Sequence, residues 1–175
     1  ADVVWWAIEP KDLKRVTARG EKTDGQADAP KWLDADFEFK DLKIFWTTKA
    51  PNVPGAAERN IGAYFEGDKG TLICDYSTMS ITINGETVSD LLTVAQSVTR
   101  SPGHQQNFID AVKSRKQPES NLAYAREMTL PMHLALISWR LNRSVEWNAK
   151  KEKFIGDKEA NTFLDRPYRK EWNLI

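Results

Sequence analysis

The stretch IGAYFEGDKGTLICDYSTMSITING, residues 61–85, decides the fold class of this chain. Apolar and polar residues alternate across residues 79–83, which is the period of a half-buried strand. The glycines of EGDKG can supply the positive φ angles of one hairpin turn, and Asn84-Gly85 is the strongest two-residue signal for another. We therefore predict strands at residues 61–65, 71–76 and 79–83.

The strand pattern extends toward the start of the chain. Three earlier strands are expected at residues 13–19, 35–39 and 42–48, and two short ones later, at 145–147 and 153–155. About six strands thus follow one another without a helix between them. This order favours an antiparallel sheet over alternating β–α units.

Helical patterns are expected at residues 2–8, 102–115, 122–141 and 157–164. We expect Ser101 to cap the second helix with Pro102 in its first position, Pro131 to kink or break the third, and Asp157 to cap the last. The predicted fold is α+β: a large, mostly antiparallel sheet with helices packed on one face, in a single domain of residues 1–175. The opposite face should keep apolar residues that need a partner.

Composition limits the possible functions. Twenty-five basic residues balance twenty-five acidic ones, so nothing indicates nucleic-acid binding. No apolar run is long enough to cross a bilayer, and no signal peptide opens the chain. The abrupt start, ADVVWWAI, is expected to be the interior of a longer protein, for which bacterial cytoplasm and periplasm are both compatible. The single cysteine, Cys74, excludes an internal disulfide and is expected to be a buried, inert thiol.

Cofactor and metal motifs are missing from the sequence. The nine glycines include no G-x-G pair, so the glycine fingerprint that holds a dinucleotide pyrophosphate cannot form here. No H-x-x-x-H metal spacing and no G-x-S-x-G nucleophile motif occurs. We expect the chain alone to bind no cofactor and no metal.

A few polar residues are candidates for a ligand site. His104 falls in the first turn of a predicted helix, beside Asn107, where free N–H groups and the helix dipole favour a polar or anionic ligand; it could equally only cap or solvate that turn. His133 lies between apolar neighbours, which predicts a buried structural histidine. Arg59 ends a Pro-rich loop and could reach a substrate or pair with Glu58 in solvent.

Seven tryptophans are many for this length. They could line a sugar-binding face by stacking on a pyranose ring. Trp5, Trp6, Trp46 and Trp139 lie in apolar patterns, however, and we expect them to be core or interface anchors.

Six motifs follow one another in a fixed order: DVVWWAI (2–8), VTARG (16–20), WTT (46–48), FEGDKGTL (65–72), SPGHQQNFIDAVKSRKQP (101–118) and KEKFIGDKEANTFLDRPYRKEW (151–172). Together they resemble the C-terminal domain of the Gfo/Idh/MocA oxidoreductases, the glucose-fructose oxidoreductase and inositol dehydrogenase family. The resemblance covers nearly the whole chain.

This resemblance implies an α+β domain whose sheet often meets a second subunit. Enzymes of the family move a hydride between a sugar or polyol carbon and NAD or NADP, which is held in an N-terminal Rossmann domain outside this sequence. The family's catalytic histidine, in an H-x-x-D motif whose aspartate matches Asp2, would precede Ala1, and its E-K-P lysine is missing, so no catalytic residue is expected here. His104 and Asn107, with Arg59 behind them, are expected to form part of the substrate pocket.

The leading hypothesis is therefore the substrate and oligomerisation domain of an NAD(P)-dependent oxidoreductase acting on a sugar, polyol or related carbohydrate. Part of an NAD-dependent glycoside hydrolase of the same family is an alternative. A stand-alone carbohydrate-binding module is another, and it predicts exposed, coplanar tryptophans on one face. A purely structural dimerisation module predicts a large apolar sheet face.

Overall fold

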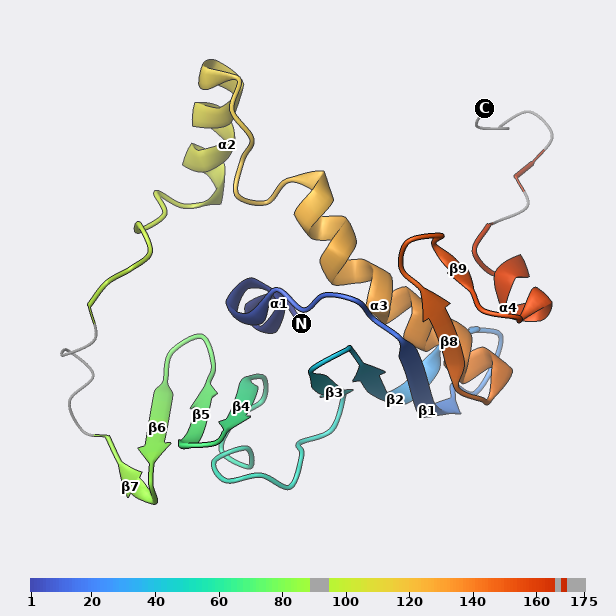
Figure 1. Cartoon of the computed structure of the whole chain (residues 1–175), viewed down its shortest axis with the longest axis horizontal. Helices are drawn as coiled ribbons and strands as arrows, with labels where there is room; N and C mark the ends of the chain where they lie inside the picture. Colours follow the sequence, from blue (N-terminus) through green and yellow to red (C-terminus); the bar gives the residue numbers. More distant parts are fainter. Residues whose placement is uncertain (89–94, 166–167, 170–175) are drawn as a thin grey trace. The chain divides into compact units, whose positions relative to one another are not determined.

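The computed structural model describes residues 1–88, 95–165 and 168–169, which fall into two compact units (Figure 1). The first unit is formed by residues 1–49 together with the chain from residue 129 onward, and the second by residues 50–128. The second unit is thus inserted into the sequence of the first.

The first unit contains an antiparallel five-stranded sheet in the order β3-β2-β1-β8-β9 (Figure 1). Its strands are β1 (Arg15–Lys22), β2 (Pro30–Glu38), β3 (Lys43–Thr47), β8 (Val145–Asn148) and β9 (Lys153–Phe154). The predicted turn between residues 39 and 42 joins β2 to β3 as an antiparallel pair, as expected. β1 pairs with β8 over only two residues, Arg15 and Val16.

One face of this sheet carries the core of the unit. Burial alternates along the central strands, and the buried residues include Val16, Ala18, Leu33, Ala35, Phe37, Val145 and Trp147. Helix α3 (Leu122–Leu141) buries residues of its second half, and Ser138 of this helix accepts a hydrogen bond from the backbone of β1. Helix α1 (Asp2–Ile8) adds Trp5, whose ring lies 6.2 Å from that of Phe37, edge to face.

The opposite face of the five-stranded sheet is mostly polar, although Phe45 of β3 lies on it and is 50% exposed. Arg15 pairs with Glu146 at 3.2 Å, and Arg19 pairs with Asp36 at 3.3 Å. Thr47 donates a 2.5 Å hydrogen bond to Asp34. The expectation of an apolar outer face is therefore wrong for this sheet, because alternate residues of β1 and β2 are charged side chains that are satisfied across the strands.

Gly20 of β1 is required by close packing. A Cβ atom at this position would lie 2.4 Å from the Trp32 carbonyl oxygen and 3.0 Å from Nε1 of Trp139. Any side chain would push the indole of α3 away from the sheet. This contact explains the glycine of the VTARG motif.

The second unit contains an antiparallel four-stranded sheet in the order β4-β5-β6-β7. Its strands are β4 (Ala63–Gly67), β5 (Gly70–Cys74), β6 (Met79–Ile83) and β7 (Glu86–Thr87). Asn84 and Gly85 have φ angles of 51° and 85°, which confirms the predicted hairpin turn. The six consecutive strands thus belong to two antiparallel sheets, and the α+β class is confirmed.

Two helix predictions needed correction. Helix α2 (His104–Ser114) begins after Gly103, two residues later than expected; the Ser101 hydroxyl donates to Glu119 at 2.9 Å instead of capping the helix. The predicted break at Pro131 does not occur: helix α3 continues through this residue, because the buried residues that follow hold the helix against the sheet despite one missing backbone hydrogen bond. Asp157 caps α4 (Lys158–Thr162) as predicted, accepting a 2.9 Å hydrogen bond from the Ala160 N–H.

We expect Ser138→Ala to lower the free energy of unfolding by about 1–3 kcal/mol. Ser138 is fully buried, and its hydroxyl accepts from the Ala18 N–H at 3.0 Å while donating to the Arg143 carbonyl at 2.7 Å. Ser144→Ala is the matched control, because that hydroxyl contacts Thr17 at the exposed surface. Urea denaturation of both variants measures the difference, and equal midpoints would contradict the assigned role.

Candidate functional site

His104 is the first residue of α2 and is exposed. The preceding Gly103 has a φ angle of 97°, so the chain turns sharply into the helix and leaves the N–H groups of the first turn facing outward. Asn107 lies one turn further on, on the same side of the helix. The two predicted residues therefore share one helix end, where hydroxyl or carboxylate groups of a ligand can be bound.

Asn107 also has a structural role. Its side-chain oxygen accepts a 3.0 Å hydrogen bond from the Glu119 N–H, and its own N–H donates to the Gly103 carbonyl at 2.9 Å. Asn107 thus ties the segment after α2 back to the helix. This contact orients the start of α2, where His104 lies.

Arg59 does not join these two residues. Its Nη1 donates to the Gly55 carbonyl at 2.5 Å, and its Nη2 donates to the Thr78 hydroxyl at 3.0 Å. Its Nε lies 3.2 Å from an Asp75 oxygen but at an angle too poor for a hydrogen bond. The partner of Arg59 is therefore Asp75 rather than Glu58, and the side chain holds the Pro-rich loop against the turn between β5 and β6.

Asp75 organises that turn. Its carboxylate accepts hydrogen bonds from the N–H groups of Ser77 and Thr78 at 2.7 and 2.6 Å, and from the Thr78 hydroxyl at 2.9 Å. The Ser77 and Thr78 N–H groups lower the pKa of Asp75 to about 2, because they stabilise the charged carboxylate. The group is a structural anchor, with no acid–base role indicated.

His133 is exposed on α3, so the prediction of a buried histidine is wrong. The buried residues of this helix include Pro131, Leu134, Ala135 and Ser138, which recur at intervals of three and four. His133 lies outside that stripe although both of its sequence neighbours are apolar. Adjacent residues of a helix face different directions, so neighbours alone do not predict burial.

The tryptophans do not form a sugar-binding face among the described residues. Trp5 and Trp147 are buried, Trp32, Trp46 and Trp139 are half-buried, and Trp6 alone of the six described is exposed. Lys49 lies 3.6 Å above the Trp32 ring, which covers part of that indole. The carbohydrate-module alternative therefore loses its main support.

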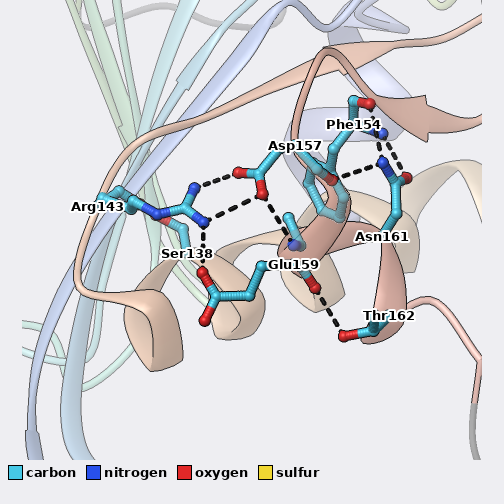
Figure 2. Close-up of polar contacts among 8 residues, drawn as sticks. Ser138, Arg143, Phe154, Asp157, Glu159, Asn161 and Thr162 are labelled. Carbon is cyan, nitrogen blue, oxygen red and sulfur yellow. Dashed lines mark hydrogen bonds and ion pairs between the residues drawn. The ribbon is translucent and has the colours of Figure 1, made fainter.

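The densest polar cluster was missed by the sequence interpretation (Figure 2). The Arg143 guanidinium contacts both carboxylate oxygens of Asp157 and lies 2.9 Å from Glu159. These contacts, led by the hydrogen bonds from Arg143, lower the pKa of Asp157. Because Asp157 also caps α4, the cluster fastens that helix to the end of α3. The charged groups of this cluster are paired with one another, so the cluster offers no ligand site.

Two hollows are present within the units. One, of about 250 Å³, is lined by apolar groups under α3, among them Leu33, Trp46 and Leu136. The other, of about 300 Å³, lies on the four-stranded sheet over Gly67 and Gly70. Neither is lined by His104, Asn107 or Arg59. The described residues also contain no cluster of acidic, histidine or cysteine side chains that could hold a metal ion, and no helix that could span a membrane.

We expect Asp75→Asn to remove an acid-dependent part of the stability. The folded-state pKa of about 2 lies below the ordinary 3.8, so the carboxylate stabilises the fold above about pH 4, and this contribution disappears as the pH falls toward 2. The difference in free energy of unfolding between wild type and variant should be constant above pH 5 and shrink toward pH 2. Urea denaturation across this range measures it, with Asp68→Asn in the turn between β4 and β5 as control. A difference that does not change with pH would refute the assignment.

Comparison with known proteins identifies the family and the fold of this chain. A model described as "Oxidoreductase family, C-terminal alpha/beta domain" of the Gfo/Idh/MocA group matches residues 33–174. No curated protein matches the chain. Among solved structures, an oxidoreductase from Agrobacterium radiobacter in complex with NAD+, L-tartaric acid and magnesium is 14% identical with a TM-score of 0.56; the match covers 83% of this chain and 46% of that one.

A second similar structure is an NAD-binding protein from Listeria innocua, 17% identical with a TM-score of 0.56, with 83% of this chain and 44% of that one covered. At these identities the likeness shows the fold. The chain spans less than half the length of both structures. Because the family model matches most of the sequence, the chain belongs to the Gfo/Idh/MocA oxidoreductase family and corresponds to its C-terminal alpha/beta domain.

Proposed function

We propose that residues 1–175 act as one substrate-binding and oligomerisation domain of an NAD(P)-dependent oxidoreductase acting on a sugar, polyol or related hydroxylated compound. The observation that carries this proposal is the family match over residues 33–174 in a chain that spans under half of two NAD-associated structures. One of these was solved with L-tartaric acid, a small hydroxylated dicarboxylate. Its presence there is in keeping with a polar, hydroxyl-bearing substrate here.

The nicotinamide cofactor does not fit the residues of this chain. The start of α2 is preceded by the single glycine Gly103, and the sequence has no G-x-G pair to approach a pyrophosphate closely. A separate Rossmann domain is therefore the proposed partner that holds NAD or NADP. The chemistry of hydride transfer belongs to that cofactor, and this chain would position the substrate.

Within this proposal the start of α2 is the substrate contact. The exposed imidazole of His104 and the N–H groups of the first turn can donate to substrate oxygens, and the bond from Glu119 fixes the neighbouring Asn107. Arg59 is engaged with Asp75 and Thr78 and would act only through the loop that it holds. The domain is also proposed to form a homo-oligomer through a sheet face.

The function is tested by expressing the encoded protein with any sequence that precedes Ala1. That protein should bind NAD or NADP stoichiometrically in calorimetry and reduce it in the presence of members of a sugar, polyol and hydroxy-acid panel. The 175-residue chain alone should do neither. Tight dinucleotide binding by the chain alone, or an encoded protein without a Rossmann domain, would overturn the proposal.

In that enzyme, His104→Ala should lower kcat/KM by roughly ten- to a hundredfold, because losing a substrate contact costs on the order of 1–3 kcal/mol. His133→Ala is a matched control, since it removes the other histidine, which is also exposed but lies on α3. The control should change kcat/KM and stability little. Steady-state kinetics at equal folded fraction decide, and an unchanged kcat/KM for His104→Ala removes this residue from the site.

A further inference from the structure

The turn between β6 and β7 presents an asparagine followed by a glycine at the surface. Asn84 and Gly85 are both exposed, and no atom lies within 4 Å of the position that a Cβ atom of Gly85 would occupy. Every other asparagine of the chain is followed by a residue with a side chain. The side-chain amide of Asn84 is therefore open both to water and to the backbone nitrogen that follows it.

This backbone nitrogen is free to react. Within the described part of the chain, the Gly85 N–H has no hydrogen-bond partner, whereas the Asn84 N–H donates to the Lys69 carbonyl at 2.9 Å. Attack of the Gly85 nitrogen on the side-chain carbon of Asn84 would close a small ring. Such intramolecular reactions are strongly favoured once the two atoms come within about 3.5 Å, and a side chain on the second residue would obstruct their approach.

The backbone of the turn must rotate to bring the two atoms together, and β7 offers little resistance. β7 is the edge strand of its sheet and pairs with β6 only at Thr87 and Glu86, which are both exposed. A hairpin end that is held by so few exposed pairs opens at a low free-energy cost. The fold therefore protects the Asn84 amide only weakly.

We propose that Asn84 is a site of spontaneous deamidation, with the Gly85 nitrogen as the internal nucleophile. A base removes the Gly85 N–H proton, the nitrogen attacks Cγ of Asn84, and the side-chain nitrogen leaves with that proton balance as ammonia. Water then opens the cyclic imide. Opening at Cγ leaves aspartate, whereas opening at the main-chain carbonyl leaves isoaspartate, whose backbone runs through the additional CH2 group of the side chain. The reaction needs no cofactor and does not depend on the proposed function.

Isoaspartate at position 84 would undo the turn. A two-residue hairpin loop joins its strands because its backbone twist matches theirs, and an additional backbone atom removes that match. The pairs of β7 with β6 should then be lost, together with the 2.9 Å hydrogen bond from the Val88 N–H to the Ile81 carbonyl. The new carboxylate also lies close in sequence to Glu86, which disfavours re-formation of the turn. Deamidation thus detaches β7 irreversibly.

The chain contains a matched internal control, Asn142. This residue is exposed and has the same φ angle as Asn84, 51°. Its successor, Arg143, carries a side chain, and the Arg143 N–H donates to the Ser138 carbonyl at 3.2 Å. The two asparagines therefore share exposure and local backbone angle but differ in the nucleophile that follows them.

Peptide mass spectrometry of the purified chain, incubated at neutral pH, tests the proposal. Asn84 should deamidate at least about tenfold faster than Asn142, and its rate in the folded chain should lie within about tenfold of its rate in urea. Labelling by an isoaspartyl methyltransferase should mark the same peptide, and Asn84→Gln should abolish this label because the longer side chain closes a larger ring. Equal rates at Asn84 and Asn142, or an Asn84 amide that survives in the folded chain while the unfolded chain is converted, would overturn the proposal.

Hydrogen exchange at the Val88 N–H tests the structural consequence. The isoaspartate form should lose protection at this position. Freshly prepared Asn84→Asp is the matched control, because it carries the same added charge on a normal backbone and suits the turn, so it should keep the protection. An isoaspartate form as protected as Asn84→Asp would show that the hairpin survives the reaction and would refute the detachment of β7. Both readouts are independent of enzyme turnover, so this proposal and the proposed function can fail separately.

Discussion

The first unit depends on how the backbone of β1 is satisfied where β8 stops pairing with it. β8 contacts β1 only at Arg15 and Val16, and the next buried inward-facing residue, Ala18, donates its N–H to the Ser138 hydroxyl. An unpaired N–H buried at this point would be costly. The Ser138 hydroxyl thus replaces the strand partner that β1 lacks at this point. The same contact fixes the position and the rotation of α3 against the sheet. The Trp139 ring can then lie against Gly20, where no side chain would fit.

The two sheets differ in the composition of one face: charged residues dominate it on the five-stranded sheet, and apolar residues on the four-stranded sheet. On the five-stranded sheet, cross-strand pairs such as Arg19 with Asp36 satisfy the charges within the chain. On the four-stranded sheet, one face carries Phe65, Leu72 and Ile81 side by side. Exposed apolar side chains also occur on helix α2, where Phe108 is 63% exposed.

The turns and helix caps that depend on a few neighbouring residues could be predicted from the sequence. The Asn84-Gly85 turn and the Asp157 cap were correct, because each depends on a few neighbouring residues. The polar outer face could also have been predicted, since Asp34, Asp36 and Glu38 alternate with buried residues along β2. Pro131 and His133 were misjudged because tertiary burial, not sequence neighbours, decides whether a helix continues and which side faces inward.

The candidate site could be predicted only in part. The sequence placed His104 in the first turn of a helix, and the structure agrees, but the partner of Arg59 lies 16 positions further along the chain, at Asp75. Contacts of this kind depend on the path of a loop, which composition does not specify. The pairing of β1 with β8 and the role of Ser138 could not be predicted from the sequence for the same reason. No local pattern in the sequence marks a residue that bonds across 120 positions.

The insertion of one unit into the other has a consequence for how the chain folds during synthesis. Arg15 and Glu146 are neighbours in the sheet but 131 positions apart in the sequence, so the five-stranded sheet cannot close until β8 and β9 have left the ribosome. The hairpins of the second unit involve only neighbouring segments and can form much earlier. In the interval β1, β2 and β3 form a three-stranded sheet whose β1 edge is open and prone to pair with other chains. The insertion thus makes the chain most vulnerable to aggregation in the interval before β8 emerges from the ribosome.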